Sequence, residues 1–530
     1  MNKQTFIQGT MILLLASIIN RILGFIPRIM LPRIIGTEGV GLYQLGYPFF
    51  LVIVTLIAGG IPLAIAKLVA EAESTGNSQR SAAILRTSLV YATAIGFLFT
   101  FICLFGAPWV SQHILTDPRV FQTFIAMSPM IVIVAVSSVY RGYFQGKQNM
   151  VPSAVSSVIE TVARIICVLW FSYLLLPWGI EYGAAGAMLG VVFGEIVGLA
   201  VLLWQYQRFR GKIQVKPKPD STACTDTAVE QQSKVSFFSL LRQIFKVALP
   251  VTGGRLVGSM SYLLESIITA RSLAIAGIAT AVATSQYGAL QGMVIPLMLL
   301  PGALTSSLAI SLVPSLAEAQ AKGDMRTIHL RLHQSIRLAL VTGAPFAAIM
   351  YVLAEPLCLL LYDNVSVAGM LKVMAPIALF SYAQAPLQAT LQALDKPGRA
   401  LINTLIGAVV KLILIYYLAS NPSLGIYGAI FAIIINIIIV TLLHGISVSN
   451  ALRFRFPTLD IIKVGGLMII MSAAAAYLYN ELVLISNQGL HFIVTCLIAG
   501  VIYLILAACL RLIDWHDIKR IPILRRWIKS

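Results

Sequence analysis

The residues of this chain with the clearest capacity for chemistry are arginines inside an apolar stretch near its start. Ile18 to Gly36 places Asn20, Arg21, Arg28 and Arg33 among apolar side chains. A guanidinium inside an apolar run is costly unless it faces a cavity, a partner or the membrane boundary. The first helix is therefore predicted to form one wall of a polar space.

Charges of both signs are also expected at membrane depth further along the chain. Five cations and three anions belong to this group: Arg21, Arg164, Arg255, Lys372, Lys411, Glu160, Glu195 and Glu265. A cavity with more cations than anions suits a phosphate or pyrophosphate head group, because Arg and Lys pair with oxygens that have lost their water. It suits a cationic drug poorly.

Spacing predicts which of these charges can pair along one helix. Glu160 and Arg164 lie four residues apart and share a helix face, so they form either an internal ion pair that holds the bundle together or part of the cavity. Arg255 and Glu265 lie ten residues apart, which is about 15 Å along a helix and too far for direct contact. Each of these two therefore needs water, substrate or a residue of another span.

Composition sets the fold class. The chain has 530 residues, of which 58% are hydrophobic and 11% charged, and its apolar runs have the length of membrane-spanning helices. We predict an all-α polytopic membrane protein. It shows no ATPase or other enzyme motif. Its six cysteines lack metal-binding spacing, so we expect neither a metal site nor a disulfide.

Fourteen transmembrane helices are predicted, and the basic residues orient them. The even-numbered loops and the termini carry 29 Lys and Arg, whereas the odd-numbered loops carry 4. This asymmetry places both termini in the cytoplasm and accounts for the basic charge without a nucleic-acid partner. The eighth span is the least regular, because Pro296 and Pro301 interrupt it. The predicted spans are 6–26, 42–66, 84–105, 121–139, 153–176, 184–204, 244–270, 286–312, 336–361, 371–394, 400–418, 427–446, 461–479 and 490–511.

The chain also repeats itself at a shift of 247 residues. AEAESTGN at Ala70 to Asn77 aligns with AEAQAKGD at Ala317 to Asp324, and the shift pairs Arg164 with Lys411. A constant offset over several spans indicates duplication, and an even number of spans per repeat makes the halves parallel. We predict an N-lobe (1–204), a polar cytoplasmic linker (205–240), a C-lobe (241–446), two extra helices (447–512) and a basic cytoplasmic tail (513–530).

Several longer motifs resemble those of a known family. NRILGFIPR (20–28), GTEGVGLYQLGYPF (36–49), IPLAIAKLVAEA (61–72) and RGYFQGKQNMVPSAVSSVIETVARI (141–165) resemble the stage V sporulation protein B family. Its members are polysaccharide-type exporters of the multidrug/oligosaccharidyl-lipid/polysaccharide (MOP) superfamily, related to the lipid II flippase MurJ. The resemblance implies two six-helix lobes around a V-shaped central cavity, alternating access, and a groove for a polyprenyl tail at the two extra helices.

The resemblance also implies roles for particular residues. Arg21 matches a cavity arginine of the related flippases, and Arg28 lies one residue beyond a second. Gln291 stands where a further arginine is expected, so either Arg255 and Arg164 supply that charge or the substrate differs. By the same analogy, Glu265 and Asn403 belong to a coupling-cation site.

These observations together predict a flippase for an undecaprenyl-pyrophosphate saccharide, a peptidoglycan precursor such as lipid II, made for the spore cortex. Arg21, Arg28, Arg164 and Arg255 would hold the pyrophosphate, with Glu160 and Gln291 also in the cavity. The expected setting is a monomer among the lipids of the bacterial cytoplasmic membrane, without a cofactor except a coupling Na⁺ or H⁺.

The alternative function is a multidrug/cation antiporter of the same superfamily, which would depend on Glu265 or Glu195 and not on Arg21. A membrane polymerase or ligase is disfavoured, because its chemistry needs charged residues in a large external loop and the external loops here are short and nearly free of charge. A scaffold without transport activity remains a further alternative.

Overall fold

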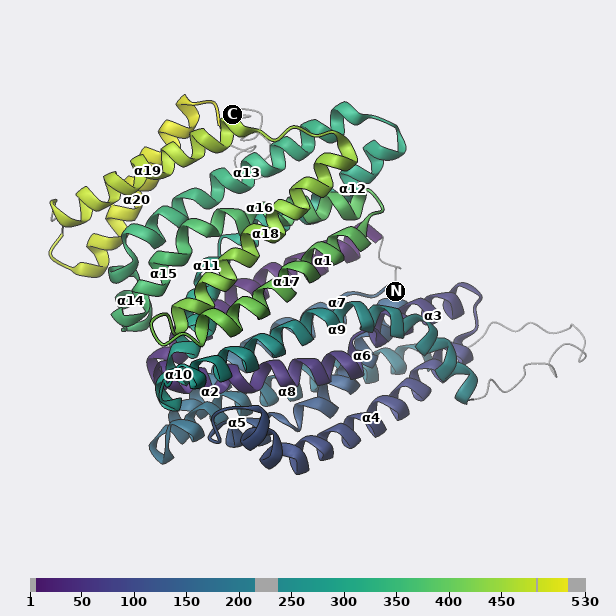
Figure 1. Ribbon diagram of the computed structural model, residues 1–530. Coiled ribbons are helices and arrows are strands. Elements are labelled where there is room, and N and C mark those ends of the chain that lie inside the picture. The colour runs from purple at the N-terminus through teal and green to yellow at the C-terminus, as the bar shows by residue number, and fades with distance from the viewer. Residues whose placement is uncertain (1–5, 215–236, 483–484, 513–530) are drawn as a thin grey trace, which may run out of the picture. The chain divides into compact units, whose positions relative to one another are not determined.

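The computed structural model describes residues 6–214, 237–482 and 485–512, and these residues form helices and turns without strands (Figure 1). Eleven helical segments within these ranges are long and apolar enough to cross a membrane. The predicted all-α polytopic class is therefore confirmed, whereas the number of fourteen spans stays a prediction. Most of the expected linker and the whole basic tail, 513–530, lie outside the described residues.

The chain divides into two compact units, of which the first comprises Met1–Ala270 and Thr280–Gly288. Most of α9 belongs to this unit, although the sequence places its span in the C-lobe, and the proposed lobe boundaries stay a prediction. The helices of the first unit are α1 (Phe6–Leu23), α2 (Phe25–Ala58), α3 (Ile61–Ser74), α4 (Ser78–Trp109), η1 (Val110–Ile114), α5 (Val120–Met127), α6 (Met130–Gly146), α7 (Val151–Leu175), η2 (Leu176–Trp178), α8 (Ile180–Gln214), α9 (Phe237–Ile275) and α10 (Thr280–Gly288).

The second unit comprises Arg271–Ala279 and Ala289–Ser530. Its helices are η3 (Ala289–Val294), α11 (Ile295–Leu299), α12 (Gly302–Ala321), α13 (Met325–Val352), α14 (Ala354–Tyr362), η4 (Val365–Val367), α15 (Ala368–Met374), η5 (Ala375–Ile377), α16 (Ala378–Ala393), α17 (Pro397–Ala419), α18 (Ile426–Leu452), α19 (Thr458–Asn480) and α20 (Gln488–Cys509). The eighth predicted span is broken as expected, with Pro296 in the first turn of α11 and Pro301 capping α12. The chain between α9 and α10 is a short turn.

A glycine separates the first two predicted spans inside α2. Gly36 has φ 67° and ψ −178°, a non-helical conformation at which the helix kinks. This region of backbone space is essentially restricted to glycine. The kink lies between the spans predicted at 6–26 and 42–66, and the apolar helical segment Met11–Ser74 covers most of the first and all of the second.

The internal repeat is visible in the backbone. Asn77 caps α4 and Asp324 caps α13, each by accepting a hydrogen bond from the backbone N–H three residues on, at Arg80 and Thr327. Their φ and ψ angles are nearly the same, −85° and 78° against −82° and 79°. The 247-residue shift also relates the ends of α3 and α12, the starts of α4 and α13, and the ends of α6 and α16.

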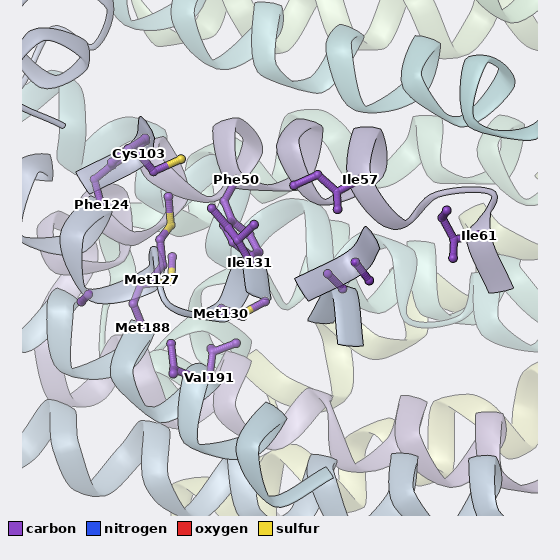
Figure 2. Packing of buried hydrophobic residues seen from close by; sticks show 14 of the residues in the cluster. Phe50, Ile57, Ile61, Cys103, Phe124, Met127, Met130, Ile131, Met188 and Val191 are labelled. Atoms are coloured by element: carbon purple, nitrogen blue, oxygen red, sulfur yellow. The ribbon is translucent and has the colours of Figure 1, made fainter. Parts of the chain in front are cut away.

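Apolar side chains from several helices form the core of the first unit. Figure 2 shows Phe50 of α2, Phe124 of α5 and Ile131 of α6 in this core. Cys103 of α4 lies buried in the same core, and the five cysteines within the described ranges are free thiols. The core holds α2, α5, α6 and α8 together, and these helices with α1 and α7 position the polar residues described next.

Candidate functional site

A polar cavity of about 490 Å³ lies in the first unit, against α1, the start of α2, α6 and α7. This volume is within the range of small-molecule binding sites. Polar side chains from all four elements line it together with small apolar ones. The lining residues are Leu13, Ala16, Ser17, Asn20, Arg21, Gly24, Arg28, Arg141, Gln145, Ser153, Ala154 and Ser157.

Three arginines contribute the formal charges of the cavity lining. Arg21 lies in the last turn of α1, Arg28 lies in the first turn of α2, and Arg141 reaches the cavity from α6. In the described part of the chain, no carboxylate lies within ion-pair distance of Arg28. The lining contains no acidic residue, so the cavity has the chemistry of an anion-binding site.

Several polar atoms of the lining lack a hydrogen-bond partner within the described residues. Asn20 donates a hydrogen bond from Nδ2 to Ser157 Oγ at 2.6 Å, which joins α1 to α7. Asn20 Oδ1, Ser153 Oγ and Arg141 Nε are buried and have no hydrogen-bond partner within the described residues. Buried polar atoms are normally paired. These three atoms therefore indicate a place for ordered water or a polar ligand.

An ion-pair network lies behind the cavity on α6, α7 and α8. Glu160, which is 5% exposed, accepts hydrogen bonds from Arg141 Nη2 at 2.5 Å and from Arg164 Nη2. Arg164 also lies 3.4 Å from Glu195 Oε1. The Glu160–Arg164 pair expected from spacing is thus present. Arg164 is not among the residues that line the cavity, and two carboxylates balance the two guanidiniums of the network.

A stripe of four glycines on α8 explains how the network residues come together. A Cβ added at Gly194 would lie 2.7 Å from Arg164 Cβ, and one at Gly198 would lie 3.0 Å from Glu160 Cβ. At Gly186 and Gly190 the nearest atoms are backbone atoms of α7, at 2.4 and 2.3 Å. Small residues four apart let membrane helices approach closely. The stripe therefore brings the α7 backbone against α8.

The other predicted site residues lie elsewhere. Arg255 on α9 donates from Nη1 to the Gly59 carbonyl oxygen at 2.6 Å. Glu265 is also on α9 in the first unit. Gln291 on η3 and Asn403 on α17 belong to the second unit.

Asn403 donates from Nδ2 to the Leu443 carbonyl at 3.1 Å and to Ser447 Oγ at 2.9 Å, both on α18. None of Arg255, Glu265, Gln291 and Asn403 lines the cavity described above. Their proposed roles in substrate binding and in ion coupling stay predictions.

Sequence reasoning missed Arg141 and the serines as cavity residues. Arg141 follows the predicted span 121–139, and a basic residue at the end of a span is normally assigned to the cytoplasmic loop. Helix α6 continues to Gly146, so Arg141 is part of the helix. Ser153 and Ser157 are four apart and share a face of α7, which is the signal that could have identified them.

Comparison with known proteins agrees with the fold and the motifs. The family model described as polysaccharide biosynthesis protein matches residues 6–320, and the MatE model matches 259–417. The chain is 40% identical to stage V sporulation protein B of Bacillus subtilis over the full length of both chains. It is 25% identical to the lipid II flippase MurJ of the same organism, over 88% of this chain and 86% of that one.

A solved structure of the lipid II flippase MurJ in an inward closed conformation has the same fold, with a TM-score of 0.67 and 18% identity over 98% of this chain and 100% of that one. The chain therefore belongs to the stage V sporulation protein B family of polysaccharide biosynthesis proteins and is a multi-pass membrane transporter of the MOP exporter superfamily.

Proposed function

We propose that this protein is a flippase that moves an undecaprenyl-pyrophosphate saccharide across the cytoplasmic membrane by alternating access. The proposed cargo is a peptidoglycan precursor such as lipid II, made for the spore cortex. The relatives named stage V sporulation protein B and lipid II flippase MurJ support this class of cargo. The proposed direction of transport is from the inner to the outer leaflet. The distribution of basic residues supports the proposed cytoplasmic location of both termini.

The observation that carries the proposal is the arginine-lined cavity. Arg21, Arg28 and Arg141 are three guanidiniums on a lining without a carboxylate. A guanidinium offers a planar fork of donors that matches phosphate oxygens, and hydrogen bonds between ionised groups are stronger than those between neutral ones. A pyrophosphate carries the complementary charge. The uncharged donors and acceptors of Asn20 and the serines suit the hydroxyl and amide groups of a sugar.

Leaflet exchange in proteoliposomes tests the proposal directly. The cargo is a fluorescent undecaprenyl-pyrophosphate saccharide, and exchange is read from the fraction that an impermeant quencher reaches. We expect the natural chain to exchange the lipid and Arg21→Ala to abolish exchange. The matched control is Arg86→Gln, because Arg86 is an exposed residue of α4 away from the cavity. This control should behave as the natural chain does.

Two outcomes would contradict the proposal. One is an absence of exchange by folded natural protein under every imposed membrane potential and every Na⁺ or H⁺ gradient. The other is exchange that Arg21→Ala leaves intact. Monodisperse elution of each variant in detergent shows that a loss of exchange is not a loss of the folded protein.

The same proteoliposomes distinguish a cation antiporter, the function that the MatE match at 259–417 favours. An antiporter would expel small cationic dyes, depend on Glu265 or Glu195, and be indifferent to Arg21. The cationic lining described above is unfavourable for such a substrate, because like charges repel in a medium of low dielectric constant. We therefore expect no dye efflux above that of empty liposomes.

A coupling Na⁺ or H⁺ is part of the proposal, and Glu265 and Asn403 are the residues proposed to take part in ion coupling. The movement of one charge across the membrane potential is worth about 2.3 kcal/mol per 100 mV, so potential alone is an alternative driving force. Exchange rates measured with a Na⁺ gradient, a pH gradient and a potential, each imposed separately, identify which of them drives the cycle.

A further inference from the structure

We propose that Arg141 is a third pyrophosphate-binding residue of the cavity and that Glu160 positions it for this role. The inference rests on the proposed flippase function. It adds Arg141, which the sequence did not place in the cavity, and gives Glu160 a positioning role in place of direct contact with the substrate. It stands on the geometry of Arg141, on the atoms around it that lack partners, and on the arrangement of Glu160 between two helices.

Arg141 has donors left over after its ion pair is made. Its guanidinium carries five N–H groups. Within the described residues its hydrogen-bond partner is Glu160, through Nη2, while Nε is buried without a partner. The Arg141 side chain is 30% exposed and lines the cavity. Glu160 thus holds the guanidinium through Nη2, and other N–H groups of Arg141 can donate to a ligand in the cavity.

The neighbouring lining indicates that the ligand is polar. Ser153 is 5% exposed and Ser153 Oγ has no partner among the described residues. Asn20 Oδ1 is also buried without a hydrogen-bond partner among the described residues, and Asn20 and Ser153 line the cavity with Arg141. An empty apolar cavity can stay dry, whereas unsatisfied buried polar atoms require a partner. A phosphate ester next to a sugar supplies acceptors for Arg141 and Ser153 and a donor for Asn20 Oδ1.

Glu160 fixes where the Arg141 guanidinium points. The carboxylate is itself held from the other side by Arg164 and lies against Gly198 of α8, where an added Cβ would meet Glu160 Oε2 at 3.1 Å. An arginine side chain loses much rotational freedom when it binds a ligand. A carboxylate that orders the guanidinium before the ligand arrives reduces this cost. Glu160 does not line the cavity, so it acts through Arg141 and not on the ligand.

The experiment is equilibrium binding of undecaprenyl pyrophosphate to the purified full chain in detergent micelles. Undecaprenyl phosphate and phosphatidylglycerol, each with one phosphate, are the comparison lipids. We expect the natural chain to prefer the pyrophosphate. Arg141→Gln should weaken its binding about 10- to 100-fold, the range expected for a lost hydrogen bond to a charged group, and should reduce the preference over the monophosphate. Arg86→Gln is the control for the loss of one positive charge.

Two substitutions test whether Glu160 positions Arg141 or only lowers the positive electrostatic potential of the cavity. Glu160→Gln and Glu195→Gln each remove one negative charge from the network, but only Glu160 bonds to Arg141. A field effect alone would tighten anion binding in both variants. If Glu160 positions Arg141, Glu160→Gln should weaken binding about 2- to 10-fold, because the cost of ordering the side chain returns. Glu195→Gln should bind no more weakly than the natural chain.

Arg141→Lys keeps the inference testable if Arg141→Gln does not fold. It retains the charge opposite Glu160 but lacks the planar fork, so it should bind the pyrophosphate more weakly than the natural chain does. Undiminished binding by the folded Arg141 variants would refute the role of Arg141. Tighter binding by both carboxylate variants would refute positioning by Glu160.

Failure of this inference can be distinguished from failure of the proposed flippase function. If the natural chain exchanges the lipid-linked saccharide but the Arg141 variants bind pyrophosphate normally, only this inference fails. If the natural chain neither exchanges the saccharide nor binds the pyrophosphate more tightly than phosphatidylglycerol, the proposed function fails and this inference falls with it.

Discussion

Substitution of one glycine on α8 should disrupt the interface that positions Glu160 and Arg164. A Cβ at Gly190 would lie 2.3 Å from Val168 N and 2.4 Å from Val168 Cα on α7. Ordinary contacts of this kind begin at 3.4 Å, so Gly190→Ala requires the two helices to separate locally by about 1.1 Å. The obstructing atoms belong to the backbone and cannot rotate away.

The size of the effect follows from this geometry. Overpacking of a well-packed interior costs typically about 1–3 kcal/mol. A gap of about 1 Å between helices also forfeits up to about half of the dispersion energy of each affected contact. Because no side-chain rotation relieves the clash, we expect the upper part of the range, about 3 kcal/mol of the free energy of unfolding. The separation would also move Arg164 and Glu160, which lie one and two turns from Val168 along α7.

The assay is denaturant unfolding in mixed micelles, with pyrophosphate binding as a second readout. Gly106→Ala is the matched control, because Gly106 lies inside α4 of the same unit and no atom stands within 4 Å of its added Cβ. This control should change stability little or raise it by up to about 1 kcal/mol, since alanine is the better helix former. Equal stability of Gly190→Ala and Gly106→Ala would refute the argument that α7 and α8 pack through glycine.

Three further predictions concern an ion pair before α5, the kink in α2 and the N-cap of α4. Asp117 is 1% exposed and pairs with Arg119 at 2.8 Å, so Arg119→Met should cost about 3 kcal/mol of the free energy of unfolding at pH 7, as for a buried pair that loses one partner. Burial alone would raise the pKa of Asp117, but the hydrogen bonds from Arg119 and Thr284 outweigh it and lower that pKa. The stabilisation by the ion pair is therefore present above the ordinary carboxyl pKa and is lost as the pH falls through the lowered pKa of Asp117. The unfolding curves of Arg119→Met and of the natural chain should converge in acid. Gly36→Ala forces a side chain into a glycine-only conformation, so it should lower the free energy of unfolding in denaturant by about 1–3 kcal/mol. A cost near zero would show that the backbone at the kink is not constrained. Asn77→Ala removes the N-cap of α4 and should cost about 1 kcal/mol, and it should speed amide hydrogen exchange in the first turn of α4 while leaving α13 unchanged.

The sequence by itself determined the fold class and part of the site. Backbone groups inside a lipid bilayer must be paired within the segment, so long apolar runs can only be helices. The four-residue spacing likewise determined that Glu160 and Arg164 pair, because a helix brings such residues together wherever it lies. Arg21 and Arg28 were predicted at a polar space because a charge in an apolar run must find one, and both line the cavity.

Only the tertiary structure decided which residues from different helices share that cavity. Arg141 reads in sequence as a basic residue at the end of a span, and its position in the cavity depends on how α6 lies beside α7, against which α1 packs. The substrate-binding role predicted for Arg164 stays a prediction. The approach of α8 supplies this arginine with Glu195 as a second carboxylate, a neighbour that its own helix does not specify. The physical reason is that helical periodicity specifies neighbours three and four residues away, while contacts between helices depend on side-chain volumes along both, such as the glycine stripe at Gly190.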